Sequence, residues 1–359
     1  MRYALCENMI IKQLFKIAAE NKASDLHLVA GLPPTLRVDG ELIKIEDKKP
    51  LTGSEIEQMA FSIITEEQKK IFVESKELDF SYEIEYKFRF RVNIHYEKNN
   101  VGLVARVINE KMPNLEDLGM PKITYDLLNL SQGLILVTGP TGCGKSTTLA
   151  AMINYINSNH SRSIITLEDP IEYLFKPDKS IIIQRQLGND MISFADGLKH
   201  ILRQDPNVVM VGEMRDLETV GATITLAETG HLVLATLHTY SAAQTIDRII
   251  DIFPPHQQNQ VRMQLSMTLA CVISQRLLPS IKGGRVAARE IMLNTPAVAN
   301  LIRENKIAQL KTVIETSSKE GMISMDQNLK KLFESKVISK EAAQAQMANP
   351  SLLDKFSIL

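Results

Sequence analysis

An eight-residue segment in the middle of the chain has the residue types that bind the phosphates of a nucleotide. Gly139-Pro140-Thr141-Gly142-Cys143-Gly144-Lys145-Ser146 fits the pattern G-x-x-x-x-G-K-[ST] at each fixed position. An apolar run at 134–138 precedes it and a helical pattern at 147–156 follows, which is the context that this motif requires. Glycines let backbone N–H groups point at phosphate oxygens, and a helix N-terminus adds partial positive charge. The segment therefore predicts a site for Mg-ATP.

Two side chains of this loop are expected to act directly. Lys145 is expected to reach the β- and γ-phosphates, and the Ser146 hydroxyl is expected to ligate Mg²⁺. Cys143 is expected to contribute only its backbone. The full predicted nucleotide-binding set is Gly139, Pro140, Thr141, Gly142, Cys143, Gly144, Lys145, Ser146 and Thr147.

Four apolar runs, each typical of a strand buried on both faces, end in residues that can do chemistry. They span 134–138, 163–167, 208–211 and 232–236. The first run leads into the loop that carries Lys145, and the others are followed closely by Glu168, Glu213 and His238. Ligands of open parallel sheets bind beyond the carboxyl ends of the strands. If these strands are neighbours, the four side chains face one site.

The two glutamates match what a nucleotide hydrolase needs, namely a carboxylate near magnesium and a group that positions the attacking water. Glu213 follows an apolar run in the Walker B arrangement, so we assign it to magnesium, through water. Glu168 is then the general base, although spacing alone would allow the two roles to be exchanged. His238 is expected to face the γ-phosphate, whereas His231 precedes the same apolar run and is not favoured by position.

Composition describes an ordinary globular protein of about two domains. The 359 residues are 44% hydrophobic and 23% charged, with 41 basic and 42 acidic residues and a net charge of -1. This balance argues against a dedicated nucleic-acid binder. The three scattered cysteines indicate a reducing compartment, and no segment reads as a signal peptide or a membrane span. We therefore expect a cytoplasmic protein without a nucleic-acid partner.

The patterns divide the chain into four parts. Residues 1–112 are expected to form a small α+β domain that begins with an amphipathic helix, and 113–121 to form a linker. Residues 122–294 alternate apolar runs with helical patterns, which predicts a parallel sheet covered by helices. Residues 295–359 are expected to form several short helices.

Local signals refine the N-terminal part. Asp39-Gly40 predicts a two-residue hairpin turn, and capping-box spacing after Thr52 and Thr65 predicts two helix starts. The segments 88–96 and 101–108 read as strands.

Four signatures resemble those of the secretion ATPases of type II secretion and type IV pilus systems. In chain order they lie at 139–146, 164–172, 212–216 and 229–239. The resemblance implies a RecA-like ATPase domain, a PAS-like N-terminal domain and a homo-hexamer. It implies Glu168 as general base, Glu213 on magnesium and His238 as sensor of the γ-phosphate, and it adds His231 to the catalytic set. It also implies that Arg89, Arg91 and Arg106 reach the nucleotide of a neighbouring subunit.

Within that family the chain resembles the pilus retraction branch. The segments 22–34, 89–93, 245–251 and 284–288 are similar to that branch, and the four-cysteine zinc site usual in extension ATPases has no counterpart. The resemblance implies ATP-driven pilus retraction and twitching motility at the inner membrane, with a platform protein and a paralogous pilus ATPase as partners. Ala299 stands where the branch has arginine, which leaves an accessory retraction motor open. A pilus or secretion assembly ATPase, a nucleic-acid motor and a nucleotide-gated scaffold are the remaining alternatives.

Overall fold

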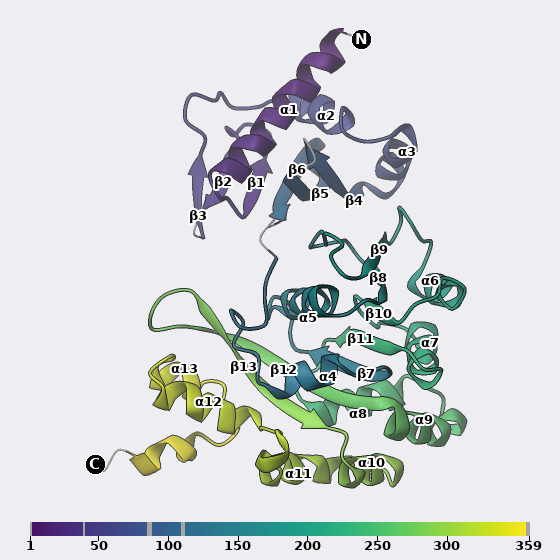
Figure 1. Cartoon of the computed structure of the whole chain (residues 1–359). Coiled ribbons are helices and arrows are strands. Elements are labelled where there is room, and N and C mark those ends of the chain that lie inside the picture. The colour runs from purple at the N-terminus through teal and green to yellow at the C-terminus, as the bar shows by residue number, and fades with distance from the viewer. Residues whose placement is uncertain (1, 39, 85–87, 109–111, 357–359) are drawn as a thin grey trace. The chain divides into compact units, whose positions relative to one another are not determined.

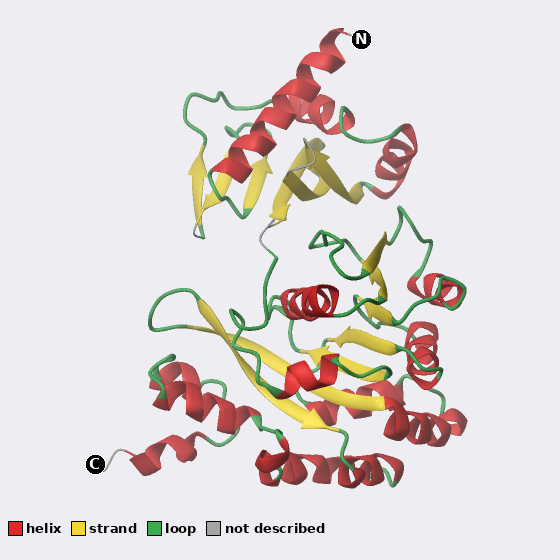
Figure 2. Ribbon diagram, viewed as in Figure 1, coloured by secondary structure: helices red, strands yellow, loops and turns green. Residues whose placement is uncertain are grey.

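The computed structural model describes residues 2–38, 40–84, 88–108 and 112–356 of the chain. Its contacts divide into two compact units, Met1–Lys111 with Pro170–Leu174, and Met112–Asp169 with Phe175–Leu359. Within the described residues, no helix combines the length and the apolar character needed to cross a membrane. Figures 1 and 2 show the helices and strands of each unit.

The described residues of the first unit form a six-stranded antiparallel sheet with three helices. The strand order is β3-β2-β1-β6-β5-β4. The strands are β1 (Asp25–Leu28), β2 (Thr35–Val38), β3 (Glu41–Lys44), β4 (Glu77–Ile84), β5 (Phe88–Glu97) and β6 (Asn100–Ile108), and the helices are α1 (Arg2–Glu20), α2 (Gly53–Phe61) and α3 (Glu66–Ser75). Ile11 and Phe15 of α1 are fully buried in one cluster with Leu26 and Phe90 of the sheet. The apolar stripe predicted for the first helix therefore covers one face of the sheet.

The structure confirms the local signals of this unit. Thr52 and Thr65 each cap a helix through a full capping box, in which the threonine and the third helical residue exchange hydrogen bonds. β2 and β3 form the predicted hairpin with Val38 paired to Glu41, and Asp39 of its turn lies outside the described residues.

The second unit is built on a seven-stranded sheet in the order β13-β12-β7-β11-β10-β8-β9. Its strands are β7 (Gly133–Thr138), β8 (Ser163–Glu168), β9 (Ile181–Gln186), β10 (Val208–Val211), β11 (Leu232–Leu237), β12 (Leu269–Pro279) and β13 (Arg285–Leu293). All neighbouring pairs are parallel except β12 and β13. The four strands predicted from apolar runs are β7, β11, β10 and β8, and they are adjacent. This confirms the condition on which the predicted site depends.

Helices pack around this sheet and continue to the C-terminal end (Figure 2). They are α4 (Ile123–Leu128), α5 (Lys145–Asn159), α6 (Phe194–Ile201), α7 (Leu217–Glu228), α8 (Ala242–Asp251), α9 (Pro255–Thr268), α10 (Pro296–Arg303), α11 (Leu310–Thr316), α12 (Met325–Glu334) and α13 (Lys340–Gln344), with 3-10 helices at Ile307–Gln309, Ser318–Glu320 and Pro350–Phe356. The succession of short helices after residue 295 agrees with the sequence expectation. The chain thus has the predicted α/β class, a P-loop domain with a smaller α+β unit.

Candidate nucleotide-binding site

The carboxyl ends of the four central strands bring the predicted residues to one edge of the sheet. Thr138, the last residue of β7, pairs with Leu237 of β11. Val211 at the end of β10 pairs with both Leu167 of β8 and Ala235 of β11. The residues that follow these strands therefore start along a common line, as the sequence predicted.

The phosphate loop is shaped by its first glycine and by the helix that follows. Gly139 has φ of +145°, and a Cβ there would lie well inside contact distance of the backbone oxygen of Gln275. Only glycine fits this position, because both the backbone conformation and the neighbouring strand exclude a side chain. α5 begins at Lys145, directly after Gly144, so the N–H groups of its first turn face the loop.

Lys145 is buried at the start of α5 and is held by the loop itself. Its Nζ donates to the carbonyl oxygens of Gly139 at 2.8 Å and Pro140 at 3.2 Å. Ser146 and Thr147 follow on the first turn of α5 and are partly exposed. An ammonium group beside a half-exposed hydroxyl is the pair that this motif offers to phosphates and magnesium.

His238 connects the phosphate loop to Glu213. Its Nδ1 lies 3.4 Å from Lys145 Nζ and 3.5 Å from Thr141 Oγ1, and its Nε2 lies 3.3 Å from Glu213 Oε2. An ammonium group can only donate and a carboxylate only accept, so this geometry fits the neutral tautomer protonated at Nε2. The imidazole thus lies between the positive and the negative side chain of the site.

Glu213 has a second partner in Arg215. The guanidinium contacts the other carboxylate oxygen of Glu213, and this hydrogen bond raises the pKa of Arg215. Glu213 is mostly buried, whereas the side chains of His238 and Arg215 are largely exposed. The carboxylate is therefore fixed from both sides while one edge of the site stays open to solvent.

Glu168 ends β8 as a buried carboxylate. Its Oε1 accepts hydrogen bonds from Thr166 Oγ1 at 2.6 Å and Gln184 Nε2 at 3.0 Å. Gly212 at the end of β10 comes so close that a Cβ would lie 3.1 Å from Leu167 O and 3.4 Å from Glu168 Cα. The glycine before Glu213 therefore lets β8 and β10 bring both glutamates to the same edge.

Within one chain, His231 does not lie with the other predicted catalytic residues at the phosphate site. It precedes β11, at the opposite end of the strand from His238, and its carbonyl accepts from Gly133 N at the start of β7. Its Nδ1 lies 3.0 Å from Leu226 O, at the end of α7. The geometry of one subunit thus gives His231 no part in the phosphate site.

The three arginines proposed from the resemblance lie in the first unit. Arg91 of β5 and Arg106 of β6 are directly paired and exposed, and Arg106 Nε donates to Asp25 Oδ1 at 2.9 Å. Arg89 lies two residues before Arg91 on the same strand and is half-buried. They form a basic row on the sheet face opposite the buried residues Phe90 and Val92.

Several residues of the site were missed by the sequence analysis. Arg215 follows Glu213 closely and could have been read from the same motif. Gln184 on β9 and Gln275 on β12 could not, because their strands were not predicted and they reach the site from far along the chain. Gln275 contacts the loop through Cys143, whose buried thiol has a raised pKa. Burial keeps that thiol in its neutral form.

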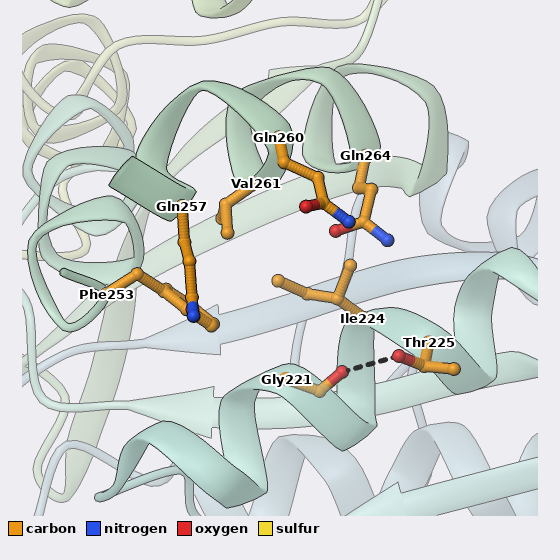
Figure 3. Close-up of a pocket in the computed structure, with 8 residues that line it drawn as sticks. All are labelled: Gly221, Ile224, Thr225, Phe253, Gln257, Gln260, Val261 and Gln264. Carbon is orange, nitrogen blue, oxygen red and sulfur yellow. Dashed lines mark hydrogen bonds between the residues drawn. The ribbon is translucent and has the colours of Figure 1, made fainter. Parts of the chain in front are cut away.

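A separate pocket lies between α7 and α9 (Figure 3), with a volume of about 350 Å³. Gly221, Ile224 and Thr225 line it from α7, and Phe253 and the glutamines and valine of α9 line it from the other side. The α9 residues are Gln257, Gln260, Val261 and Gln264. None of these belongs to the predicted phosphate site.

Among the described residues, no group of three His, Cys, Asp or Glu side chains could hold a metal ion.

The parallel sheet, the phosphate loop and the glutamates beyond its strands define a P-loop nucleotide-binding domain. Residues 3–345 match the family described as Type II/IV secretion system protein, and the chain belongs to that family.

Known relatives cover almost the whole chain. It is 46% identical to the type IV pilus retraction ATPase PilT of Pseudomonas aeruginosa, over 95% of this chain and 99% of that protein. PilU of the same bacterium is 40% identical over 94% and 88%. A twitching motility protein of Neisseria gonorrhoeae is 44% identical over 97% and 93%. The crystal structure of the pilus retraction motor PilT with bound ADP matches with a TM-score of 0.90 at 45% identity, over 96% and 99%.

Proposed function

We propose that this chain is a motor ATPase that couples ATP hydrolysis to type IV pilus retraction. The observation that carries the proposal is the hydrogen-bonded chain from Lys145 through His238 to Glu213, in a protein similar to PilT along nearly its whole length. The chain of contacts supports ATP chemistry, and the similarity supports the pilus as its object. The protein would act in the cytoplasm, at the inner-membrane base of the pilus, on a platform protein there.

Each side chain of the site has a role in this proposal. Lys145 binds the β- and γ-phosphates, Ser146 ligates Mg²⁺ and Glu213 contacts the ion through water. Glu168 takes the proton of the attacking water, because its carboxylate is buried at the end of β8 and its orientation is fixed by two donors to Oε1. His238, between Lys145 and Glu213, responds to the γ-phosphate. Magnesium supplies charge neutralisation at the phosphates.

The protein is proposed to work as a homo-hexamer in which Arg89, Arg91 and Arg106 serve the nucleotide of a neighbouring copy. The pairing of Arg91 with Arg106 concentrates positive charge on an exposed face, which favours a phosphate ligand. A trans-acting arginine contributes on the order of 10³–10⁵ in rate to phosphoryl transfer. Specific ATPase activity should therefore rise with protein concentration through the assembly range. Constant specific activity across that range would contradict the trans mechanism.

Lys145→Ala tests the ATPase assignment. Loss of the ammonium group is expected to abolish hydrolysis and weaken binding of a fluorescent ATP analogue, because no other side chain of the loop carries positive charge. Lys176→Ala is a matched control, since that lysine is exposed and lies outside the loop. Wild-type affinity and turnover in Lys145→Ala would overturn the proposed site.

A deletion strain tests the pilus assignment. Excess surface pili with lost twitching would support retraction, whereas absent pili would indicate an assembly ATPase. Stimulation of the ATPase by DNA or RNA would favour a nucleic-acid motor instead.

An accessory retraction motor similar to PilU is the second candidate. It is favoured by one observation: Ala299 of α10 replaces the arginine of the retraction branch. If the protein is the accessory motor, its deletion should leave retraction detectable and Ala299→Arg should restore independent retraction in the absence of a paralogue. A complete loss of retraction on deletion would rule out the accessory role.

A further inference from the structure

Gln275 of β12 contacts the phosphate loop from the side opposite β11. Its side chain is buried, and its Nε2 donates to the carbonyl oxygen of Cys143 at 2.9 Å. Its Oε1 accepts from Thr148 Oγ1 of α5 at 3.0 Å. Its backbone oxygen also packs against Gly139, so one residue contacts the beginning of the loop, its end and the helix that follows.

The hydrogen bond to Cys143 fixes the orientation of a peptide group that belongs to the phosphate site. In a planar trans peptide, the carbonyl and the following N–H point in opposite directions. With the Cys143 carbonyl directed at Gln275, the N–H of Gly144 is directed away from β12. The N–H groups of such a loop are the donors to phosphate. Gln275 therefore orients one of those donors through the backbone.

Arg289 of β13 is the cross-strand partner of Gln275. Directly paired residues of an antiparallel ladder share a face, so the two side chains project to the same side of the β12–β13 hairpin. Arg289 is 6% exposed, and its guanidinium donates to Leu118 O at 2.9 Å and Gly119 O at 3.4 Å. The same hairpin thus contacts the phosphate loop through one side chain and the segment 114–120 through the other.

The segment 114–120 belongs to the expected linker, yet it is packed within the second unit. Leu115 and Met120 are buried. Tyr125 donates to Glu116 at 2.7 Å and stacks edge-on against Tyr155 of α5, the helix that begins at the phosphate loop. The segment is therefore tied to the nucleotide domain at both the hairpin and α5.

Arg289 makes this attachment sensitive to small displacements. Burial lowers the pKa of Arg289 to about 10, so the group stays charged at neutral pH. Among the described residues its Nε has no hydrogen-bond partner, and its other nitrogens depend on the two carbonyls of the segment. A buried guanidinium that lost those carbonyls would be left without compensation. The segment and the hairpin are thus expected to move together.

We propose that Gln275 is a positioning residue of the phosphate loop and that, with Arg289, it links nucleotide occupancy of the loop to the segment 114–120. This inference rests on the proposed function, since it requires a nucleotide in the loop. When the loop closes on phosphate, the Cys143 carbonyl moves and displaces Gln275 of β12. Arg289, the cross-strand partner of Gln275, moves with it. The carbonyls of Leu118 and Gly119, which Arg289 contacts, are displaced in turn. The conformation of the segment 114–120, which follows the first unit in the sequence, then depends on whether nucleotide is bound in the second unit.

Hydrogen exchange of the full-length protein, with and without Mg-ADP, tests the link. In wild type, Mg-ADP is expected to slow exchange of the amides in 114–120. Arg289→Met is expected to abolish that change while ADP affinity stays within about twofold, because Arg289 does not touch the loop. Arg289→Lys, which keeps the charge, is expected to restore part of it. Arg285→Met is the matched control, an exposed arginine of the same strand, and should behave as wild type.

A second pair of variants tests Gln275. Gln275→Leu keeps the size but removes both hydrogen bonds, and ADP affinity is expected to fall about tenfold as the Gly144 donor loses its orientation. Thr148→Val removes only the bond to Gln275 Oε1 and should change affinity by less than about threefold, while the melting temperatures show whether both variants fold. Equal affinities in the two variants would overturn the positioning role.

The outcomes separate this inference from the function on which it rests. If wild type fails to bind Mg-ADP, the proposed function fails. Two results refute the link alone, provided that wild type binds and hydrolyses nucleotide. In the first, Mg-ADP does not change the rate of amide exchange in 114–120. In the second, Mg-ADP changes that rate equally in wild type and in Arg289→Met.

Discussion

The role of Glu168 as general base can be tested with little disturbance of the fold. Glu168→Gln removes the basic oxygen but keeps an amide of the same shape. Both hydrogen bonds from Thr166 and Gln184 go to a single carboxylate oxygen, Oε1. The carbonyl oxygen of a glutamine can accept both bonds, so the buried geometry can be kept.

The expected sizes of the two effects follow from this arrangement. General base catalysis contributes about 10²–10⁴ in rate, so kcat should fall by that factor, or about 3–5 kcal/mol in activation free energy. The free energy of unfolding should change by less than about 1 kcal/mol, because Thr166 and Gln184 both keep their acceptor. In Thr166→Val the larger effect should instead be on the free energy of unfolding and not on kcat. This variant removes a donor to a buried carboxylate, which costs about 1.5–3 kcal/mol of stability.

Steady-state ATPase assays, binding of a fluorescent ADP analogue and urea unfolding together measure these quantities. Glu172→Gln is the matched control, because Glu172 lies in the same acidic segment and is exposed. Nucleotide affinity should be unchanged in Glu168→Gln. A kcat within about threefold of wild type would refute the base assignment and favour Glu213 in that role. In cells, normal pilus dynamics with Glu168→Gln would instead support a scaffold that binds ATP without using its hydrolysis.

Three further perturbations test the surroundings of the site. Gly212→Ala places a methyl group 3.1 Å from Leu167 O; we expect a loss of about 1–3 kcal/mol in urea unfolding together with reduced kcat, and an unchanged kcat would show that the close approach of β8 and β10 is dispensable. Burial raises the pKa of Glu290, so the folded state holds this proton more tightly and the contribution to stability falls as pH rises from about the unfolded value through the folded one. Glu290→Gln, which still can accept from the backbone N–H at the start of α8, should therefore gain stability relative to wild type as pH rises above the ordinary value of a glutamate carboxyl, and a difference in unfolding free energy that stays constant during that rise would contradict this reasoning. Arg106→Gln breaks an ion pair with Asp25, whose carboxylate is buried although the arginine is largely exposed, so a loss of about 1–3 kcal/mol in stability is expected; ATPase activity of the folded variant at high protein concentration should fall toward the value of dilute protein, and an undiminished activity would exclude Arg106 from the trans mechanism.

Features that depend on local pattern could be predicted from the sequence. The capping boxes at Thr52 and Thr65 satisfy backbone donors within three residues, so their physics is contained in the segment itself. The four central strands were predictable because strands buried on both faces must be apolar throughout. Their common edge then followed from the rule that ligands of parallel sheets lie beyond the carboxyl ends.

Features that depend on distant pairing could not be predicted. β12 and β13 carry polar and charged residues at buried positions, among them Gln275 and Arg289, so their apolar pattern is interrupted. Those residues are stabilised by partners far along the chain, 132 residues away for the bond between Gln275 and Cys143. The role of Gln184 at Glu168 is hidden in the same way, because β9 is an edge strand with mixed exposure.

The charges at the sheet edge favour Mg-ATP over a simple anion as the ligand in the proposed function. Lys145 is engaged by loop carbonyls and by His238, and Glu213 is engaged by Arg215 and His238. A phosphate alone would attract the lysine but repel the nearby carboxylate. Magnesium held by Ser146 and Glu213, as proposed, would add positive charge on the side of Glu213 and offset that repulsion. His238 contacts both side chains, so in the proposed function it would respond when Lys145 binds the γ-phosphate.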